Sequence, residues 1–529
     1  MRIPWGKRIM TGLAALSMLA FAAAPTQAAT SQVSGTLFYG QPAPPASLDP
    51  GRATVDNQTW KVLLNTYDAL VQFKSGTDDI IPDLATSWTQ TGNRVWTFNL
   101  RHGVKFQDGT TLNSQDVAYS IKRIQELGLP VDTITSQIAS ISTPSPLKVI
   151  LTLKAPNSYF LNQLPAVYIV SEQTVAAHAV KGDMGAQWLG DNTAGSGPYK
   201  LVSWNHNSEM VLQAYPGYWQ GWAGKHVKQV KILYVSDEAT QIEMLQQGGL
   251  DMLAYAEPDL ATQIKQDPRG YPGLSVVFGK SFETDYMAIN MSKPPLNNVL
   301  VRQAIADCFP YQQFASKVTR GLGSVPRGPL PVGFPGADPN IPAGQLNLQQ
   351  AKSLLAKAGY ANGGFTLTYA YAAPQVSEQE AGLFLQSNLG TLGINVQLQP
   401  TPWAILVQEA GKGPQGPDLM AVEMPASNTD PIYFLSQLYS SSLAGQPFNW
   451  SYFKNPQVDK LMTEAYAAIT PAARNQDLAQ MQELIVKAVP AVYYSNPGKY
   501  EIVSTKVHGY TPFPLYYYLV DFYDLWMSH

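Results

Sequence analysis

The sequence is poor in cysteine and in charge. Only one of its 529 residues, Cys308, is a cysteine, so no intramolecular disulfide can form, and Cys308 is expected to be a small core residue. Charged residues make up 14%, against about a quarter in an average soluble domain. The formal net charge is −3, so there is no basic excess to attract the phosphates of a nucleic acid. The composition therefore predicts no nucleic-acid partner.

The motifs of common catalytic and nucleotide sites are also missing. There is no P-loop, and no Gly-x-Gly-x-x-Gly segment opens a helix after a strand. Gly195-Ser196-Gly197 lacks the spacing of a nucleophile elbow, and no two of the six histidines have metal-ligand spacing on one helix face. We therefore expect no enzyme activity, no cofactor and no metal. Carboxylates remote in sequence can still converge in a fold, which leaves a secreted hydrolase of oligosaccharides or peptides as the alternative.

The N-terminus has the three parts of an export signal. Arg2, Lys7 and Arg8 form a positive region, residues 9–24 form an apolar run, and Thr26-Gln27-Ala28 supplies small residues for cleavage. We predict a cleavable signal peptide over residues 1–28, whose removal makes the mature chain more acidic. Because no cysteine follows the apolar run, a lipoprotein anchor is not expected. The predicted location is the periplasm.

The chain is long, and it is rich in apolar and aromatic side chains. It exceeds the roughly 250 to 300 residues at which one hydrophobic core stops growing, so at least two lobes are expected. Hydrophobic residues make up 45%, and there are 11 Trp and 28 Tyr. Aromatic side chains combine a stiff apolar surface with a polar tip, which suits a cleft that grips a small ligand.

Local patterns in the first third predict both strands and helices. Residues 36–39 predict a strand followed by a Pro-rich loop over 41–50. Alternating apolar residues over 96–100 predict a second strand, which continues through Val104 and Phe106 after a turn at Gly103. A helix follows, with Asn113 as its N-cap and a capping box.

The pattern from Asn347 onward indicates the fold class. Asn347 caps a predicted helix that ends at Gly359, and a strand over 365–371 follows. A second helix over 377–392 and a strand over 394–398 complete a parallel strand–helix–strand crossover. Residues 230–249 predict a further unit of this kind. The sequence is therefore predicted to be an α/β protein.

Motifs along the chain resemble a known family. The run Trp96–Thr110, followed by Asp116-Val117 and Ser120, is similar to the signature of family 5 bacterial extracellular solute-binding proteins, which include dipeptide, oligopeptide, nickel and some oligosaccharide binders. Shorter matching pieces occur in order along nearly the whole mature chain: Leu48-Asp49-Pro50, Tyr67–Val71, Pro82–Ala85, Gly195–Tyr199, Val301–Ala304, Ala358-Gly359-Tyr360 and Asn455–Asp459.

The resemblance implies a two-lobed periplasmic-binding-protein fold of type II, cluster C-like, with an extra domain on the first lobe. The long motif would lie in that extra domain and be structural. The implied domains are a signal peptide over 1–28, lobe I over 29–75, 193–285 and 497–529, the extra domain over 76–192, and lobe II over 286–496.

The resemblance also implies a function. The protein would be the periplasmic receptor of an ABC importer, binding a peptide-like or other small organic solute in the interlobe cleft. It would act as a monomer and deliver the ligand to a permease and ATPase complex in the inner membrane. Closure would depend on the ligand's differential affinity for the two states. A chaperone-like or signalling receptor on the same scaffold would differ only in its partner.

The departures from the family pattern concern the ligand. In dipeptide and oligopeptide members an Asp lies three residues before an Asp/Glu-Pro pair and holds the peptide's amino group; here the pair is Asp430-Pro431 and that position is Ser427. The Arg that holds a dipeptide's carboxylate falls where this chain has Ala372-Ala373-Pro374. A zwitterionic dipeptide would therefore lack partners for its charges, unless Glu423 replaces the missing Asp.

The resemblance further predicts the pocket. Trp403 aligns with an aromatic residue that lines the pocket of oligopeptide binders, and Met424 falls where those proteins have Trp. The predicted ligand-binding residues are Trp403, Glu423, Met424, Ser427 and Asn428 on one lobe and Tyr39 and Gln41 on the other.

Overall fold

The structure is a computed structural model, and the predicted signal peptide lies outside the residues that it describes. The residues it describes are 35–52, 57–253, 258–373, 375–468, 470–515 and 519–528.

A mixed sheet is built from the N-terminal strand and from strands of the middle and the end of the chain. Its central strand β1 pairs in parallel with β10 on one side and with β11 on the other, and the outer neighbours are antiparallel. In order, the strands are β12 (Leu274–Gly279), β18 (Lys499–Ser504), β11 (Met252–Leu253), β1 (Thr36–Gln41), β10 (Gln229–Tyr234), β9 (Glu209–Ala214) and β8 (Tyr199–Asn205). The predicted crossover over 230–249 is confirmed, because helix α7 (Glu238–Gln247) connects β10 to β11 and ends at Gly248 in the left-handed conformation.

A second mixed sheet contains the other predicted crossover. Strands β14 and β15 are parallel and are joined by helix α12 (Val376–Gly390), as the sequence predicts. In order, the strands are β15 (Asn395–Thr401), β14 (Thr366–Ala372), β16 (Leu419–Pro425), β13 (Glu283–Ile289) and β17 (Ala491–Ser495). Every residue of β13 is buried, which fits its position between β16 and β17.

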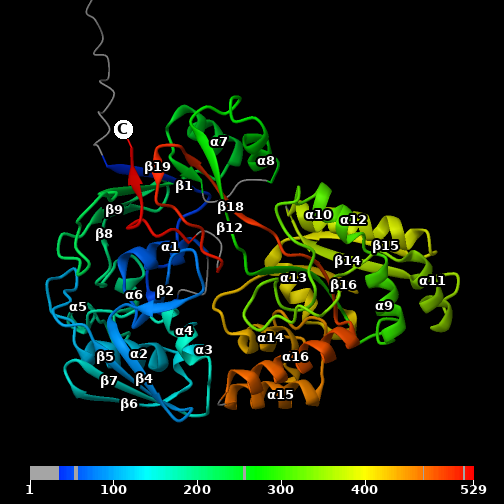
Figure 1. Cartoon of the computed structure of the whole chain (residues 1–529), viewed down its shortest axis with the longest axis horizontal. Helices are drawn as coiled ribbons and strands as arrows, with labels where there is room; N and C mark the ends of the chain where they lie inside the picture. Colours follow the sequence, from blue (N-terminus) through cyan, green and yellow to red (C-terminus); the bar gives the residue numbers. More distant parts are fainter. Residues whose placement is uncertain are drawn as a thin grey trace, which may run out of the picture. The chain divides into compact units, whose positions relative to one another are not determined.

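A third, antiparallel sheet carries the long motif of the sequence. In order, its strands are β4 (Ala85–Thr91), β5 (Val95–Leu100), β7 (Lys148–Leu153) and β6 (Ile138–Ser145). Helix α2 (Ser114–Leu127) lies over this sheet (Figure 1), and the predicted capping box at Asn113 is present. Trp96, Phe98 and Leu100 are buried, as their alternation predicts.

The predicted continuation of β5 through Val104 and Phe106 is wrong. Both side chains are fully buried, but β5 ends at Leu100 and only an isolated bridge joins Lys105 to Thr111. Phe106 instead closes a turn, because its N–H donates to the carbonyl of Thr110 and its own carbonyl accepts from Gly109. The alternating apolar side chains are buried in a core, but their backbone does not form a strand with any other described segment.

The remaining elements are two short ribbons and the helices. The ribbons are β2 (Val71–Phe73) with β3 (Ile80–Pro82), and β19 (Val507–His508) with β20 (Trp526–Met527). The other helices are α1 (Asn57–Thr66), α3 (Asp132–Thr135), α4 (Phe160–Gln163), α5 (Glu172–Ala177), α6 (Ala186–Leu189), α8 (Pro258–Gln266), α9 (Val299–Asp307), α10 (Tyr311–Lys317), α11 (Leu348–Lys357), α13 (Trp403–Ala410), α14 (Pro431–Tyr439), α15 (Pro456–Ala467) and α16 (Pro471–Ala488), with short 3-10 turns at Pro50–Arg52, Leu164–Ala166, Gly413–Gln415 and Ser441–Leu443.

The chain passes between the seven-stranded and five-stranded sheets through two short connections. Residues 280–282 join β12 to β13, and residues 496–498 join β17 to β18. The Asn496 side chain donates to the carbonyl of Glu283 at 2.8 Å and to Thr284 Oγ1 at 2.9 Å, so it ties the second connection to the start of β13, where the first connection ends. These paired connections can serve as a hinge. The domain boundaries inferred from the sequence stay predictions.

A buried ion pair fastens the loop after β1 to helix α2. Arg123 donates to both carboxylate oxygens of Asp49, at 2.9 and 2.6 Å, and its Nε donates to the carbonyl of Met184. The two side chains are 1% and 0% exposed. Such a bidentate pair, shielded from solvent, fixes the relative position of two segments that are far apart in sequence.

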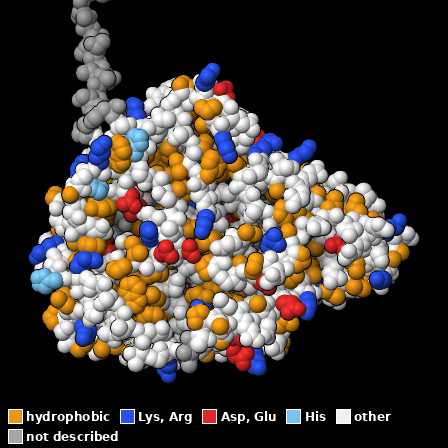
Figure 2. Space-filling view, viewed as in Figure 1, with side chains coloured by type: hydrophobic (Ala, Val, Ile, Leu, Met, Phe, Trp, Pro, Cys, Tyr) orange, Lys and Arg blue, Asp and Glu red, His pale blue; other side chains and the backbone are white. Residues whose placement is uncertain are grey.

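The face of the protein in Figure 2 shows no continuous patch of one charge. Lys and Arg side chains are interspersed with Asp and Glu over this face. Among the described residues, no helix combines the length and the apolar character needed to cross a bilayer. The predicted core position of Cys308 is confirmed, since its side chain is fully buried at the end of α9.

Candidate functional site

A cavity of about 320 Å³ lies where several distant parts of the chain meet. This volume falls at the lower end of the range typical of small-molecule sites. It is bordered by α1 and the segment after it, by the β2–β3 ribbon, by α4 and the turn after it, by the C-terminal segment, and by the loop between β16 and α14. The lining therefore includes residues next to the seven-stranded, four-stranded and five-stranded sheets.

One wall joins helix α1 to the C-terminal segment. The Asn65 side chain donates to the carbonyl of Val520 at 2.7 Å and accepts from the N–H of Phe522 at 2.8 Å. Ser75 in the β2–β3 turn donates to Asp524 at 2.7 Å. These hydrogen bonds join residues that are more than 400 positions apart in the sequence, and they hold α1 and the β2–β3 turn against the C-terminal segment.

Another wall is the loop before α14, which carries Ser427 and Asn428. Asp430 caps α14 by accepting from the N–H groups of Ile432 and Tyr433, and its other carboxylate oxygen accepts from the Gln163 side chain at 2.8 Å. Asn162 likewise donates to Thr429 Oγ1 at 2.8 Å. Two residues of helix α4, which lies outside the five-stranded sheet, therefore hold this loop in place.

The Gly195-Ser196-Gly197 motif supports the floor of the site and is not a nucleophile elbow. A Cβ at Gly195 would overlap the carbonyl oxygen of Thr66, so the close approach of these two segments requires glycine. Ser196 is buried, and its hydroxyl donates to Asp68 Oδ2 at 2.7 Å. The motif thereby orients a carboxylate that lines the cavity.

The cavity has an acidic side formed by Asp68, Asp83 and Asp521. Burial raises the pKa of Asp68 to about 6, partly offset by the hydrogen bond from Ser196. Burial and then the charge of Asp68 raise the pKa of Asp83 well above its usual range. Burial and the charge of Asp524 raise the pKa of Asp521 to about 7. The carboxylates therefore lie close enough to disfavour one another's ionised forms.

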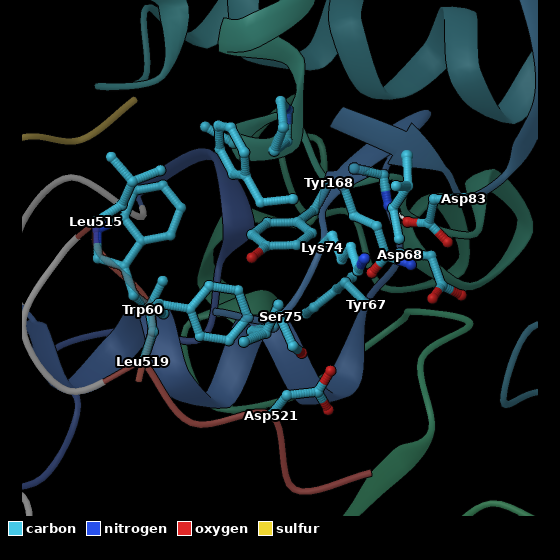
Figure 3. A pocket seen from close by; sticks show the side chains of 18 of the residues that line it. Trp60, Tyr67, Asp68, Lys74, Ser75, Asp83, Tyr168, Leu515, Leu519 and Asp521 are labelled. Atoms are coloured by element: carbon cyan, nitrogen blue, oxygen red, sulfur yellow. Dashed lines mark hydrogen bonds between the residues drawn. The ribbon is translucent and has the colours of Figure 1, made fainter. Parts of the chain in front are cut away.

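The rest of the lining is mainly aromatic and apolar. Figure 3 shows the Tyr168 ring in the middle of the cavity, Leu515 and Trp60 on one side of it, and Asp68 and Asp83 on the other. A ligand in this cavity would therefore meet an apolar surface at one end and carboxylates at the other.

Two of the seven predicted ligand-binding residues, Ser427 and Asn428, line this cavity. Tyr39 and Gln41 do not; both lie on β1 and are fully buried. Gln41 accepts from the Lys61 ammonium at 2.9 Å, and the same ammonium lies 3.7 Å from the centre of the Tyr39 ring. These two residues lie in the seven-stranded sheet, beside a buried cation of α1.

The other three predicted residues lie around the five-stranded sheet, outside the lining of the cavity. Trp403 begins α13, is 44% exposed and packs edge-on against Trp450. Glu423 and Met424 are at the end of β16, where Glu423 is paired in register with Asp285 of β13.

Glu423 belongs to an acidic cluster that we define as Glu283, Asp285, Glu378 and Glu423. The first two begin β13, and Glu378 lies in the first turn of α12, where it accepts from the N–H of Ala372 at 2.7 Å. Burial, followed by the charge of Glu423, raises the pKa of Glu378 to about 8. Glu378 is therefore mostly protonated in the folded protein at neutral pH.

Sequence reasoning missed the acidic and aromatic residues of the cavity. Asp68 and Asp83 each interrupt an apolar stretch, and that placement of a carboxylate among core residues was a usable signal. Tyr168, Tyr218 and Asp521 carry no comparable local signal, because only the fold brings them together. No group of three or more His, Cys, Asp or Glu in the described parts of the chain is arranged to hold a metal ion.

The titration of Glu378 predicts a pH dependence of stability. Between its ordinary pKa of 4.5 and its folded pKa of about 8, the folded chain retains a proton that the unfolded chain has lost. The free energy of unfolding therefore falls as pH rises through this window, by at most about 1.4 kcal/mol per pH unit from this group. Glu378→Gln, which keeps an acceptor for Ala372, is expected to make the fall from pH 5 to pH 8 shallower in urea unfolding.

Glu380→Gln on the same helix serves as the control, because the Glu380 side chain is partly exposed. It is expected to leave the pH dependence of the urea midpoint as it is in the unaltered protein. Equal slopes for Glu378→Gln and the unaltered protein would contradict the protonated state of Glu378.

Comparison with known proteins extends these findings. The profile of the family described as "Bacterial extracellular solute-binding proteins, family 5 Middle" matches residues 79–446. The chain is 29% identical over 489 residues to a probable D,D-dipeptide-binding periplasmic protein of Escherichia coli (strain K12), covering 90% of this chain and 92% of that protein. It is 25% identical over 474 residues to heme-binding protein A of Haemophilus influenzae, covering 85% of each.

Solved structures share the fold over nearly the full length. A periplasmic binding protein of A. tumefacien R10 in complex with agropinic acid has a TM-score of 0.75 and 26% identity, covering 94% of this chain and 99% of that chain. An ABC transporter-associated periplasmic binding protein of Helicobacter pylori in complex with the peptide STSA has a TM-score of 0.79 and 24% identity, covering 94% of this chain and 98% of that chain. The expected two-lobed fold is thereby confirmed.

Proposed function

Because the chain belongs to the family 5 bacterial extracellular solute-binding proteins, we propose that it captures a small organic solute in the cavity and delivers it to an ABC importer. The observation that carries this proposal is the composition of the cavity. Ser427 and Asn428 come from the part of the chain that forms the five-stranded sheet, while all the other described lining residues come from outside it. A ligand that contacts both sides would favour a closed arrangement of the two lobes.

The ligand class that we propose is a peptide-like or other small organic molecule. Relatives are named for a D,D-dipeptide, for glutathione and for heme, so the scaffold accommodates diverse ligands. Ser427 cannot provide the carboxylate that holds an amino group in dipeptide and oligopeptide binders. We therefore propose that Ser427 and Asn428 contact the ligand as neutral hydrogen-bonding groups.

The remaining parts of the proposal concern location, partners and chemistry. We propose export to the periplasm by a cleaved signal peptide over 1–28, without a lipid anchor, and function as a monomer without a nucleic-acid partner. The ligand is released to the permease and ATPase complex chemically unchanged, so the protein is not an enzyme. A hydrolase would instead convert its ligand.

A thermal-shift screen of the mature protein tests the receptor function. With a library of peptides, sugars and amino-acid derivatives, a true ligand present at 100 times its dissociation constant should stabilise the fold by about 2.7 kcal/mol. Mass spectrometry should then recover that ligand unchanged after incubation. No stabilisation by any compound in a folded, ligand-free sample, or a converted compound, would refute the proposal.

Two variants and one control decide whether the cavity or the region around Trp403 receives the ligand. Ser427→Phe places a ring in the cavity and is expected to abolish binding, whereas Ser442→Phe on an exposed turn should leave it intact. Trp403→Ala removes a ring outside the cavity lining and should have little effect on the dissociation constant. If Trp403→Ala abolishes binding and Ser427→Phe does not, the ligand binds around α13.

A further inference from the structure

We infer that the ligand carries an organic cation, such as a protonated amine, a guanidinium or a quaternary ammonium group, which the acidic side of the cavity holds. This inference rests on the proposed receptor function and names the chemistry of its ligand. It follows from the charge balance, an unpartnered carboxylate oxygen and the aromatic surface around it.

The charges of the cavity lining are unbalanced. Of the four acids that line the cavity, Asp68 and Asp83 are buried, Asp521 is half-buried and Asp524 is exposed. The only basic residue among the described lining residues is Lys74, which is exposed. Within the described parts of the chain, no Lys or Arg nitrogen lies within 4.0 Å of any of these four carboxylates. A buried carboxylate without a cation is costly, so a ligand cation would improve the local electrostatics.

Arg101 lies outside the lining, and its guanidinium has other partners. The Arg101 guanidinium lies 3.9 Å from the centre of the Trp219 ring, and its Nε donates to the backbone carbonyl of Asp83 at 3.2 Å. Its charge lowers the pKa values of Asp68 and Asp83 but does not overcome the effect of burial. Arg101 therefore leaves the side-chain carboxylates unpaired.

Asp83 has one oxygen that the protein does not use. Its Oδ2 accepts from the N–H of Ala69 at 2.8 Å, whereas its Oδ1 has no hydrogen-bond partner. The side chain is 3% exposed and lines the cavity. Buried polar atoms are nearly always hydrogen-bonded, so a ligand donor that reaches this carboxylate would supply the partner that the described residues do not.

The surroundings of the carboxylates fit an organic cation. The rings of Tyr168 and Tyr218 line the cavity, and burial, followed by the charges of Asp68 and Asp83, raises the pKa values of both tyrosines. Aromatic faces attract ammonium and guanidinium groups, with the strongest effect when these are desolvated. Trp60, Leu515 and Leu519 on the other side would pack against the apolar body of the same ligand (Figure 3).

Charge-varied probes test this inference by isothermal titration calorimetry. Leu-Leu amide, which carries only a positive charge, is compared with its N-acetylated neutral form and with N-acetyl-Leu-Leu, which carries only a negative charge. Phenethylamine and 2-phenylethanol form a second, non-peptide pair. We expect each cation to bind at least about tenfold more tightly than its neutral partner, as a charge-assisted hydrogen bond allows.

Variants locate the effect. Asp83→Asn keeps an acceptor for Ala69 and removes the charge, and Asp521→Asn is the second variant if Asp83→Asn fails to fold. Either substitution is expected to raise the dissociation constants of the cationic probes by about tenfold or more and to leave those of the neutral probes unchanged. Asp267→Asn is the control, because Asp267 is an exposed acid outside the cavity lining. It should change the dissociation constants of neither the cationic nor the neutral probes.

The possible outcomes separate the inference from the receptor function. If neutral or anionic compounds, from these probes or from the library, bind at least as tightly as cations, the inference is wrong and the receptor function stands. Cation binding that survives both aspartate substitutions also overturns the inference. If neither the probes nor the library compounds bind, the receptor function itself is contradicted.

Discussion

Replacing Arg123 with methionine is expected to destabilise the protein by about 3–5 kcal/mol, measured as a lower midpoint of urea unfolding. The substitution leaves the Asp49 carboxylate fully buried without its cation, because both of its oxygens accept from Arg123 in the intact protein. It also removes the donor to the carbonyl of Met184. Few single substitutions outside a hydrophobic core have so large an effect.

The double variant Arg123→Met/Asp49→Asn separates the unpaired charge from lost packing. Asparagine keeps an acceptor for the N–H of Gly51, which Asp49 Oδ1 now binds at 3.0 Å, but carries no charge. We expect the double variant to be more stable than Arg123→Met alone. A double variant as unstable as the single one would show that the guanidinium acts through packing and not through charge.

Substituting alanine for Gly498 is the second large effect that we expect, at about 3 kcal/mol of lost stability. Gly498 lies in the connection from β17 to β18, and a Cβ there would overlap the carbonyl oxygen of Leu322. Backbone atoms cannot rotate away as a side chain can. The neighbouring segment is held in place, because Ser324 and Asn496 exchange two backbone hydrogen bonds at 2.9 and 3.0 Å.

Gly390→Ala is the matched control for Gly498→Ala. Gly390 ends helix α12, and nothing lies within 4 Å of the Cβ that alanine would add. This variant is expected to gain about 0.5 kcal/mol, since alanine restricts the unfolded chain more than glycine does. The urea midpoints of the two variants test whether the added methyl group at Gly498 destabilises the fold. Equal midpoints would mean that the backbone around Gly498 and Leu322 makes room for this group without loss of stability.

Much of the fold could be predicted because local patterns determine it. The cap at Asn113, the alternation over 96–100 and the crossover from 365 to 398 each depend on neighbours within a few residues. The failure at Val104 and Phe106 shows the limit of this reasoning. Apolar alternation reports burial, and a strand also needs a partner with free backbone groups, which the sequence does not reveal.

The candidate site could be predicted only in part. Ser427 and Asn428 were found through the resemblance to a family, which places the loop before Asp430-Pro431 in the cleft. Asp68 and Asp521 are separated by more than 400 residues, so no local pattern links them. The acidic side of the cavity exists only because the C-terminal segment returns to α1, and that return depends on long-range hydrogen bonds such as those of Asn65.

The buried thiol of Cys308 makes this protein convenient for fluorescence. Burial raises the pKa of the thiol to about 12, so the reactive thiolate is scarce at neutral pH and dyes that need it cannot reach the sulfur. Two cysteines introduced at exposed positions, such as Asn207 beside the seven-stranded sheet and Thr391 beside the five-stranded sheet, would then take a donor and an acceptor dye without removal of the native one. Energy transfer between the dyes would follow the two lobes in single molecules as ligand arrives and leaves.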